Sequence, residues 1–317
     1  MPRVSVIVPA FNCARFLGEA VRSALGQTYG DHEIIVADDG STDDTQEVVG
    51  RCGGGVLYLH QPNRGPSAAR NLALSRAGGE FVAYLDADDM WYPDKLERQV
   101  AFLDTNRRHA LVHGEIDVID ERNQVIQRRF NQRTGRGIPR GNCTLELLRA
   151  SHVQTLTVMV RREYVDRVGR FDERLRCNED YLQWILVSME GGSVGYIEEP
   201  LAMYRRTNGS LSSNPRSMCV ELMKMFEILL NEKCLGERGG AEAVEVVRSR
   251  LYELGRALAY LERSEGQAHQ ARRRLVGLIR ERPLEPSLYV DLLKACVPSV
   301  LERKLRGSRD AWREARK

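Results

Sequence analysis

The 317-residue chain has 42% hydrophobic and 29% charged residues, typical of a globular protein with room for one large domain and a smaller one. A net charge of only +3, without interleaved aromatic and basic residues, argues against a nucleic-acid partner. No apolar run reaches the roughly 18 residues that span a bilayer, and we expect no signal peptide. Because the seven cysteines include no Cys-x-x-Cys pair, we expect a cytoplasmic protein without disulfides or a zinc site.

Short β-branched runs alternate with helical patterns over the first third of the chain. Strands are predicted over residues 4–8, 33–37, 56–59 and 81–85, and helices over 16–25, 45–49 and 67–77. Such alternation builds βαβ units, so the predicted fold class is α/β, a Rossmann-like, mostly parallel sheet flanked by helices. After Pro93 the pattern predicts another helix, a strand over 111–119, an irregular Arg/Gly/Asn-rich loop over 128–142 and a last strand over 194–197.

From about residue 217 the pattern is purely helical, which predicts a C-terminal α-helical extension. Apolar stripes over 244–261 and 271–279 indicate a helical hairpin faintly like a tetratricopeptide unit. One such pair buries too little surface alone, so it should pack on the first domain or on a partner. We therefore predict domains over 1–215 and 216–317, and a homo-oligomer is one compatible arrangement.

The tail, residues 301–317, is basic and carries Leu301, Leu305 and Trp312 among its charges. Two interpretations are equally good. The tail is either a peripheral contact with an anionic membrane surface or a solvated terminal helix. The first would place the protein on the inner face of the membrane.

An apolar strand runs straight into three carboxylates, Asp86, Asp88 and Asp89. In open α/β sheets, ligands bind at the carboxyl ends of the strands. Clustered carboxylates repel one another unless a cation lies between them, and a hard divalent ion is the natural one. The plainer alternative is a polar turn that caps the helix beginning at Pro93.

Polar segments follow the other predicted strands as well, so all of them should share one crevice. Phe11 offers a flat face for a base, and Asp38 and Asp39 can accept hydrogen bonds from a base N–H or from ribose hydroxyls. Arg70 can neutralise a phosphate in bidentate fashion, and Gly65 lets the backbone approach closely. These residue types suit a nucleoside diphosphate.

Taken together, the motifs resemble those of the inverting family 2 glycosyltransferases with a GT-A fold, over roughly residues 3–212. The resemblance rests on Pro-Ala-Phe-Asn at 9–12, Asp-Asp-Gly-Ser-Thr-Asp-Asp-Thr at 38–45, Asn-Arg-Gly-Pro-Ser-Ala-Ala-Arg-Asn at 63–71, Asp86-Ala-Asp88 and Glu179-Asp180. It implies a nucleotide-sugar donor, with UDP favoured, a Mn²⁺ or Mg²⁺ cofactor, and a saccharide or lipid-linked saccharide acceptor. The implied process is cell-surface polysaccharide synthesis.

The same resemblance implies roles for individual residues. Phe11 would stack on or line the base, with Pro9 and Asn12 also among the nucleotide-binding residues. Asp38 and Asp39 would contact the base and ribose, with Asp39 at the base N–H. Arg70 would approach the phosphates, and Asp86 the ribose or sugar, with Asp88 and Asp86 at the metal. The plain alternative for residues 38–42 is a turn with a helix cap.

The Glu179-Asp180 pair begins a predicted helix, where the dipole stabilises anions, and by itself it would be an ordinary helix start. The resemblance instead makes Asp180 the general base, with Glu179 as its neighbour and reserve candidate. Asp180 would take the proton of the acceptor hydroxyl as that oxygen attacks the anomeric carbon.

The chain departs from the family pattern in three respects. Gln183-Trp184 is a fragment of the Gln-x-x-Arg-Trp motif of processive synthases, so we expect transfer of a single sugar. Residues 204–208 contain no His, which leaves a second protein ligand of the metal unassigned, and Arg205 and Arg206 either cover the diphosphate or are solvated. We also expect no transmembrane helices after the domain, in contrast to the polymer-exporting members of the family.

The main rival hypothesis is a non-catalytic sugar-nucleotide-binding scaffold whose helical region does the work. Intact candidates for both the metal site and the base count against it. The identities of the sugar and the acceptor do not follow from the residues.

Overall fold

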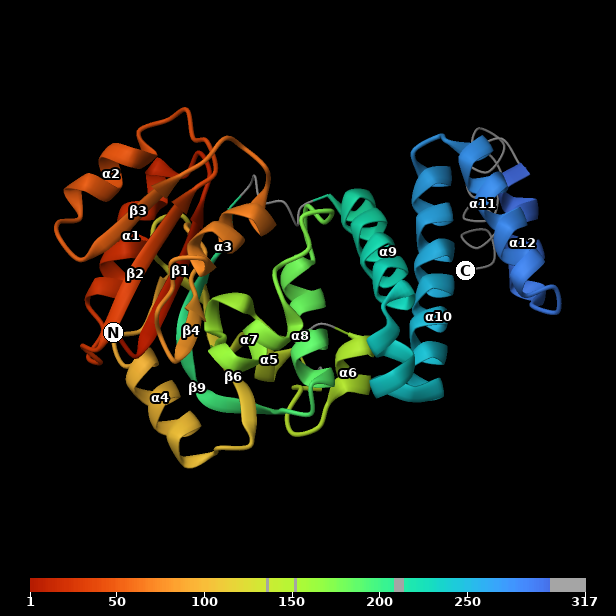
Figure 1. Cartoon of the computed structure of the whole chain (residues 1–317). Coiled ribbons are helices and arrows are strands. Elements are labelled where there is room, and N and C mark those ends of the chain that lie inside the picture. The colour runs from red at the N-terminus through yellow and green to blue at the C-terminus, as the bar shows by residue number, and fades with distance from the viewer. Residues whose placement is uncertain (135–136, 151–152, 208–213, 297–317) are drawn as a thin grey trace, which may run out of the picture. The chain divides into compact units, whose positions relative to one another are not determined.

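The computed structural model describes residues 1–134, 137–150, 153–207 and 214–296 (Figure 1). It divides into two compact units, one formed by Met1–Ser213 with Ile228–Val246, the other by Asn214–Glu227 with the chain from Val247. Residues 228–246 of the helical region thus group with the sheet, whereas residues 214–227 group with the second unit. The domain boundary at residue 215 stays a prediction.

The first half of the sheet unit is the βαβ series that the sequence predicts. Its elements are β1 (Val4–Ala10), α1 (Ala14–Leu25), β2 (His32–Asp38), α2 (Thr45–Arg51), β3 (Val56–His60), α3 (Pro66–Leu74) and β4 (Phe81–Tyr84). Strand β1 pairs in parallel with β2 and β4, and β2 pairs in parallel with β3. The predicted α/β class is confirmed.

The second half of the unit completes the sheet with mixed pairings. Its elements are β5 (Met90–Trp91), α4 (Lys95–Thr105), β6 (His109–Ile119), β7 (Val125–Gln127), α5 (Phe130–Arg133), α6 (Thr144–Arg149), the 3₁₀ turn η1 (Thr155–Thr157), β8 (Met159–Arg161), α7 (Arg162–Val168), α8 (Glu179–Met189) and β9 (Ser193–Arg205). The strand order is β3-β2-β1-β4-β8-β6-β9-β5, with β7 paired to β6. Strand β8 is antiparallel to both β4 and β6, whereas β6 and β9 are parallel.

Strand β4 is buried on both faces, as expected of a central strand between helical layers. Phe81 and Ala83 join the cluster that contains Leu17 of α1. Tyr84 points to the opposite face, with its ring centroid 5.7 Å from that of Phe171 and 5.2 Å from that of Trp184. Because side chains alternate along a strand, these apolar residues anchor both faces and fix where the chain leaves the sheet at residue 86.

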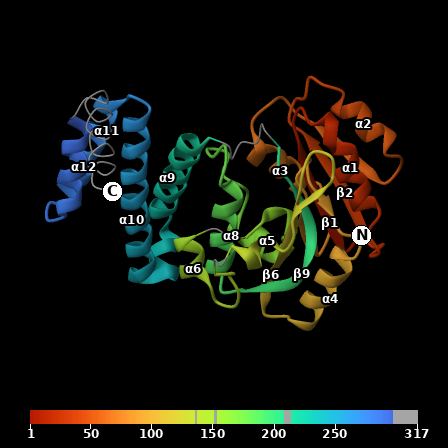
Figure 2. The same ribbon diagram turned by 180° about the vertical axis from the view of Figure 1, so that it is seen from behind.

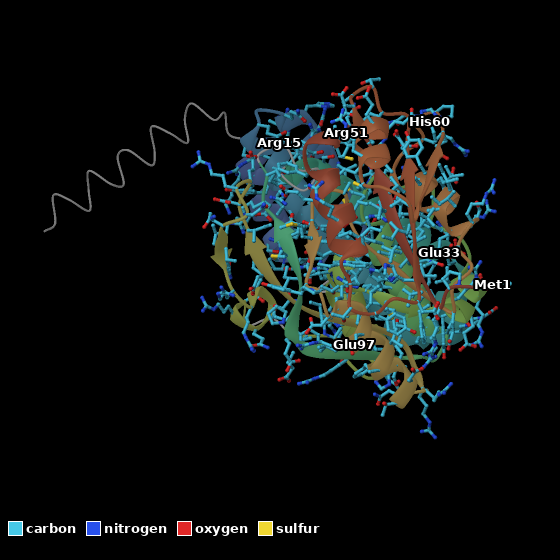
Figure 3. The ribbon with its side chains drawn as sticks, turned by 90° about the vertical axis from the view of Figure 1, so that its left-hand side faces the viewer. Met1, Arg15, Glu33, Arg51, His60 and Glu97 are labelled. Carbon is cyan, nitrogen blue, oxygen red and sulfur yellow. The ribbon has the colours of Figure 1, made fainter. Side chains whose placement is uncertain are left out.

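Figure 3 shows the two edges of this sheet, with Arg15 and His60 at the carboxyl-end edge and Met1 and Glu33 at the amino-end edge. At the amino-end edge Glu33 is a structural acid, since it accepts a hydrogen bond from Ser5 Oγ at 2.6 Å. The chemistry-bearing segments of the sequence all lie at the other edge.

The structure departs from the predicted elements in three places. The stretch 128–142 is not wholly irregular, because it contains α5. Strand β9 is much longer than the predicted 194–197, since it continues to pair with β6, through shifts in register, up to Arg205. Beyond Pro283, where the apolar stripe ends, an unexpected helix α12 (Pro286–Cys296) follows.

The helical region holds α9 (Pro215–Asn231), α10 (Lys233–Ser264) and α11 (Ala268–Glu281) before α12. Gly240 interrupts α10 with a φ of 72°. The predicted hairpin of α10 and α11 is present, and its core includes Leu275, Leu278 and Leu288. Thus α12 supplies the third helix that a two-helix hairpin needs to bury its apolar stripe. Among the described residues, no helix is long and apolar enough to cross a membrane.

Candidate active site

Three carboxylates follow β4 at the carboxyl-end edge of the sheet. Asp89 N donates to Asp86 O at 3.1 Å, which closes a turn and gathers residues 86–89. Asp86 and Asp88 are partly exposed, whereas Asp89 is buried and accepts a hydrogen bond from Arg205 N at 2.7 Å. Arg205 Nε also donates to Asp88 O at 2.7 Å. The end of β9 therefore fixes the backbone of this carboxylate turn, defined as residues 86–89.

The carboxylate turn disfavours its own negative charge. Burial, and then the neighbouring Asp86, raises the pKa of Asp88 to about 6. Burial, followed by repulsion from Asp88 and Asp86, raises the pKa of Asp89 well above its usual range. A divalent cation would relieve this repulsion, so the donor set fits a metal held by Asp88 and Asp86. In the described part of the chain no three His, Cys, Asp or Glu residues form a ready-made metal cluster.

Arg70, on α3, is buried between two acids. Its Nη2 donates to Asp86 Oδ1 at 2.9 Å, and its Nη1 pairs with Glu179 Oε1. Arg70 Nε and Glu179 Oε2 are both buried without a hydrogen-bond partner among the described residues. Phosphate binding by Arg70 stays a prediction. The structure adds that Arg70 joins the carboxylate turn to Glu179 at the start of α8, and Glu179 lies 109 residues beyond Arg70 along the chain.

The two acids at the start of α8 have different surroundings. Burial, opposed by Arg70 and assisted by Asp180, raises the pKa of Glu179 to about 7. Asp180 is partly exposed; its Oδ2 accepts a hydrogen bond from Thr155 Oγ1 at 2.5 Å, and Trp184 Nε1 donates to the same hydroxyl at 3.2 Å. Asp180 Oδ1 accepts from Tyr181 N at 2.7 Å. A carboxylate has about four lone-pair positions, so Asp180 keeps room for an incoming hydroxyl.

The segment before α8 is bound to α3 by polar side chains. Ser67 Oγ donates to Asp172 O at 2.9 Å, and Asn71 Nδ2 donates to Phe171 O at 2.9 Å. Phe171 N in turn donates to Asn71 Oδ1 at 2.9 Å. Helix α3 therefore positions both Arg70 and the chain that leads into Asp180.

The end of β1 is tied to the loop after β2. Pro9 is partly buried in β1, while Phe11 is 49% exposed and free to present its ring. Asn12 has a φ of 47°, a left-handed conformation that Asn tolerates better than most residues. Its N donates to Ser41 Oγ at 2.9 Å, and its Oδ1 accepts from Thr42 N at 2.8 Å. Asn12 thus connects the two loops by hydrogen bonds, and Phe11 is its neighbour in the chain.

Asp38 and Asp39 are both buried and engaged by the chain itself. Asp38 accepts from Ser41 N at 2.8 Å and from Tyr58 Oη at 2.5 Å. The carboxylate of Asp39 holds the loop after β3 through three donors, namely Gln61 Nε2 at 2.6 Å, Arg64 N at 2.9 Å and Gly65 N at 2.7 Å. Arg64 N also lies 3.1 Å from Asp39 Oδ2, so both carboxylate oxygens accept hydrogen bonds from this loop. The contacts of both residues with base and ribose stay predictions.

Two residues near the site escaped the sequence-based prediction. Arg205 was expected either to cover the diphosphate or to be solvated, and both alternatives are wrong because it is 1% exposed. It instead pairs with Glu19 at 2.8 Å and donates to Asn123 Oδ1 at 2.5 Å. Thr155 was missed altogether, since a lone Thr in a loop gives no signal that it will meet Asp180.

Comparison with known proteins now assigns the family. Residues 5–169 match the protein family described as "Glycosyl transferase family 2". The chain belongs to this family. A glycosyltransferase of Bacillus subtilis (strain 168), TuaG, which is named for teichuronic acid biosynthesis, is 32% identical over 218 residues, covering 67% of this chain and 82% of its own. An uncharacterized glycosyltransferase of Rickettsia conorii is 32% identical over 238 residues, which is 74% of this chain but 38% of the relative. The chain thus spans well under half of that relative.

Solved structures confirm the GT-A fold. The S. aureus TarS fragment 1–349 in complex with UDP-GlcNAc superposes with a TM-score of 0.65 and 21% identity, covering 92% of this chain and 89% of that one. The mannosyltransferase PcManGT from Pyrobaculum calidifontis, in complex with GDP-Man and Mn²⁺, gives a TM-score of 0.61 and 19% identity, covering 93% and 86%. At these identities the likeness concerns the fold alone.

Proposed function

We propose that this protein is a metal-dependent, inverting glycosyltransferase. It moves one sugar from a nucleotide-diphosphate sugar, with UDP favoured, to a hydroxyl of a saccharide or lipid-linked saccharide acceptor in cell-surface polysaccharide synthesis. The observation that carries the proposal is the bridge formed by Arg70, which brings the carboxylate turn and the Glu179-Asp180 pair into one site. A sugar donor at the first and an acceptor at the second would meet there.

In this mechanism the chain's own residues divide the work. Phe11 and Asp39 bind the base, and Asp38 braces the loop against which the ribose lies. Asp88 and Asp86 would hold Mn²⁺ or Mg²⁺, which when bound would neutralise the charge of the nucleoside diphosphate that leaves as its bond to the anomeric carbon breaks. Asp180 accepts the proton of the attacking hydroxyl, and Thr155 keeps its carboxylate oriented. An α-linked donor would yield a β-linked product.

Of the two acids at the start of α8, Asp180 is the better base. Glu179 is buried, and one of its oxygens is already paired with Arg70. Asp180 is partly exposed, so an acceptor hydroxyl can reach it. We assign Glu179 to placing Arg70 between the donor side and the acceptor side of the site.

Calorimetric titration with UDP, GDP and dTDP, with and without Mn²⁺, tests the donor site. Binding of one nucleotide that requires the metal is expected, and the Asp88→Asn variant should lose the metal dependence. Asp94→Asn is the matched control, because Asp94 is a half-exposed acid at the start of α4 that pairs with Arg98. If well-folded protein binds no nucleotide, the donor-site assignment fails.

The base is tested by turnover. In Asp180→Asn, hydrolysis or transfer of the matching nucleotide sugar should fall by about 100-fold or more, while nucleotide binding is unchanged. The scaffold alternative predicts nucleotide binding without any turnover in the wild-type protein.

The remaining expectations on partners also belong to the proposal. The basic tail, residues 301–317, lies outside the described residues, so membrane contact through it stays a prediction. A homo-oligomer and a cytoplasmic location likewise stay predictions.

A further inference from the structure

One strongly charged surface segment has no part in the mechanism above. Residues 122–142 contain six arginines and neither aspartate nor glutamate. Of these arginines, Arg122, Arg128, Arg129, Arg133 and Arg140 are exposed. The side chain of Arg128 is 68% exposed and that of Arg140 is 69% exposed. We refer to residues 128–133, which carry three of them, as the arginine arm.

Two buried carboxylates of β6 hold the arginine arm in place. Asp117, which is 1% exposed, accepts hydrogen bonds from Arg129 N at 2.8 Å and from Arg128 Nη1 at 3.2 Å. Glu115, two residues earlier on the same face of the strand, accepts from Asn131 N at 2.7 Å. A buried carboxylate is costly unless it is fully hydrogen-bonded, so these contacts specify the path of the arm.

The backbone of the arm is strained at the point where it begins. Arg129 has a φ of 49°, which is uncommon for a residue with a long side chain. Such strain persists only where the surroundings over-determine the conformation, and it concentrates at functional sites. The contact of Asp117 with Arg129 N supplies that constraint. The conformation of the arm is therefore specified by the contacts around it.

The arm lies beside the carboxylate turn. Tyr92, three residues beyond Asp89, donates its hydroxyl to Asp117 Oδ2 at 2.9 Å. Arg205, whose backbone binds Asp89, also reaches Asp120 O at 3.3 Å at the base of the hairpin that leads into the arm. Figure 2 shows α5 of the arm alongside β6 and β9. This is the side of the sheet away from β1, β2 and β3, whose loops the nucleotide would occupy.

The positive charge of the arm is only partly compensated by the protein. Arg128 shares Asp117 with two other donors, and Arg129 reaches only the neutral Gln132, at 3.4 Å. Within the described residues the Arg133 guanidinium has neither an ion-pair partner nor a hydrogen-bond partner. Exposed guanidinium groups match the planar geometry of carboxylates and phosphates.

We propose that the arginine arm binds the acidic groups of the acceptor, which is therefore a saccharide bearing carboxylate or phosphate groups. This inference rests on the proposed function and names its acceptor class. Arg128, Arg129 and Arg133 hold the acidic groups and leave the acceptor's hydroxyl to Asp180.

The test uses the full-length chain and defined probes. Binding of oligogalacturonate and of linear polyphosphate is measured by titration at low and moderate salt, beside a neutral galactose oligomer of equal length and vesicles of phosphatidylglycerol. The variants are Arg128→Gln and Arg133→Gln. Arg51→Gln is the matched control, since Arg51 is 70% exposed and pairs with Glu47 at the end of α2.

The wild-type protein should bind at least one acidic oligomer and not the neutral one. Each arm variant should weaken that binding about tenfold, which is the loss of one charge-assisted hydrogen-bonded contact. The Arg51 control should not change it. Added salt should weaken the wild-type binding because exposed charges are screened.

Three outcomes would overturn the inference: no preference for acidic over neutral oligomers, binding unchanged in both arm variants, or arm-dependent binding to the vesicles alone. Titration with the nucleotide and Mn²⁺ in the same preparations separates this failure from that of the proposed function. If the nucleotide binds and the acidic oligomers do not, only the acceptor class is wrong. If the acidic oligomers bind and no nucleotide does, the donor site is wrong and the acceptor role falls with it.

Discussion

Replacing Arg70 by Met tests whether the bridge between the carboxylate turn and α8 is a matched ion pair. The substitution keeps much of the side-chain volume but leaves Glu179 buried without its cation. Removing one member of a buried pair typically costs about 3–5 kcal/mol. Asp86 is one-third exposed and can be hydrated instead, so the lower end applies, and we expect a loss of about 3 kcal/mol in the free energy of unfolding at pH 8.

The loss should depend on pH in a definite direction. The folded-state pKa of Glu179, at about 7, already lies above the 4.5 of an unperturbed Glu, so its ionised form is disfavoured in the folded protein. Without Arg70 the folded pKa of Glu179 rises further. Below about pH 7 both proteins hold Glu179 protonated in the folded state, so the extra loss caused by Arg70→Met grows as pH rises from about 7 towards the higher folded pKa of the variant. Arg70→Met should therefore be markedly less destabilising at pH 5.5 than at pH 8.

A double-mutant cycle isolates the pair. In a Glu179→Gln background there is no buried charge to strand, so Arg70→Met should cost only about 1 kcal/mol, from the weaker contact with Asp86. Urea unfolding followed by tryptophan fluorescence measures this, because Trp91 and Trp184 are both buried in the sheet unit. Equal losses in the two backgrounds, or a loss that does not change between pH 5.5 and 8, would refute the reasoning.

Three further predictions follow from the same site. Asp88→Asn should stabilise the metal-free protein by about 1 kcal/mol at pH 8, because it removes a carboxylate whose folded pKa is raised to about 6; thermal unfolding measures this, and no gain would contradict the assigned repulsion. Thr155→Val should lower kcat about tenfold, since Asp180 loses the hydroxyl that orients it, while the affinity for the nucleotide in calorimetry stays the same; equal loss of both would make Thr155 merely structural. Phe11→Ala should weaken nucleotide binding by about 1–3 kcal/mol without changing stability, and unchanged affinity would remove Phe11 from the base site.

The relation between sequence and structure differs from one part of this site to another. The carboxylate turn could be predicted because its position depends only on a short local pattern, an apolar strand followed by Asp86, Asp88 and Asp89. The βαβ alternation then dictated that the ends of β1, β2 and β4 meet at one edge.

What the tertiary structure decided is how the charged side chains pair. Arg70 lies among polar and small residues, and nothing local distinguishes a phosphate ligand from a bridge to Glu179. The sequence around Arg205 is typical of a surface position. Arg205 is nevertheless buried, because β9 extends beyond its predicted end and places Arg205 against the carboxylate turn. Hydrophobic periodicity depends on neighbours within a few residues, so the helices and strands can be predicted from the sequence. The partner of a buried charge, by contrast, can lie 100 or more residues away along the chain, as Glu179 does from Arg70. An unpaired charge in the interior is costly, but this cost can select a partner only after folding has brought the charged groups together.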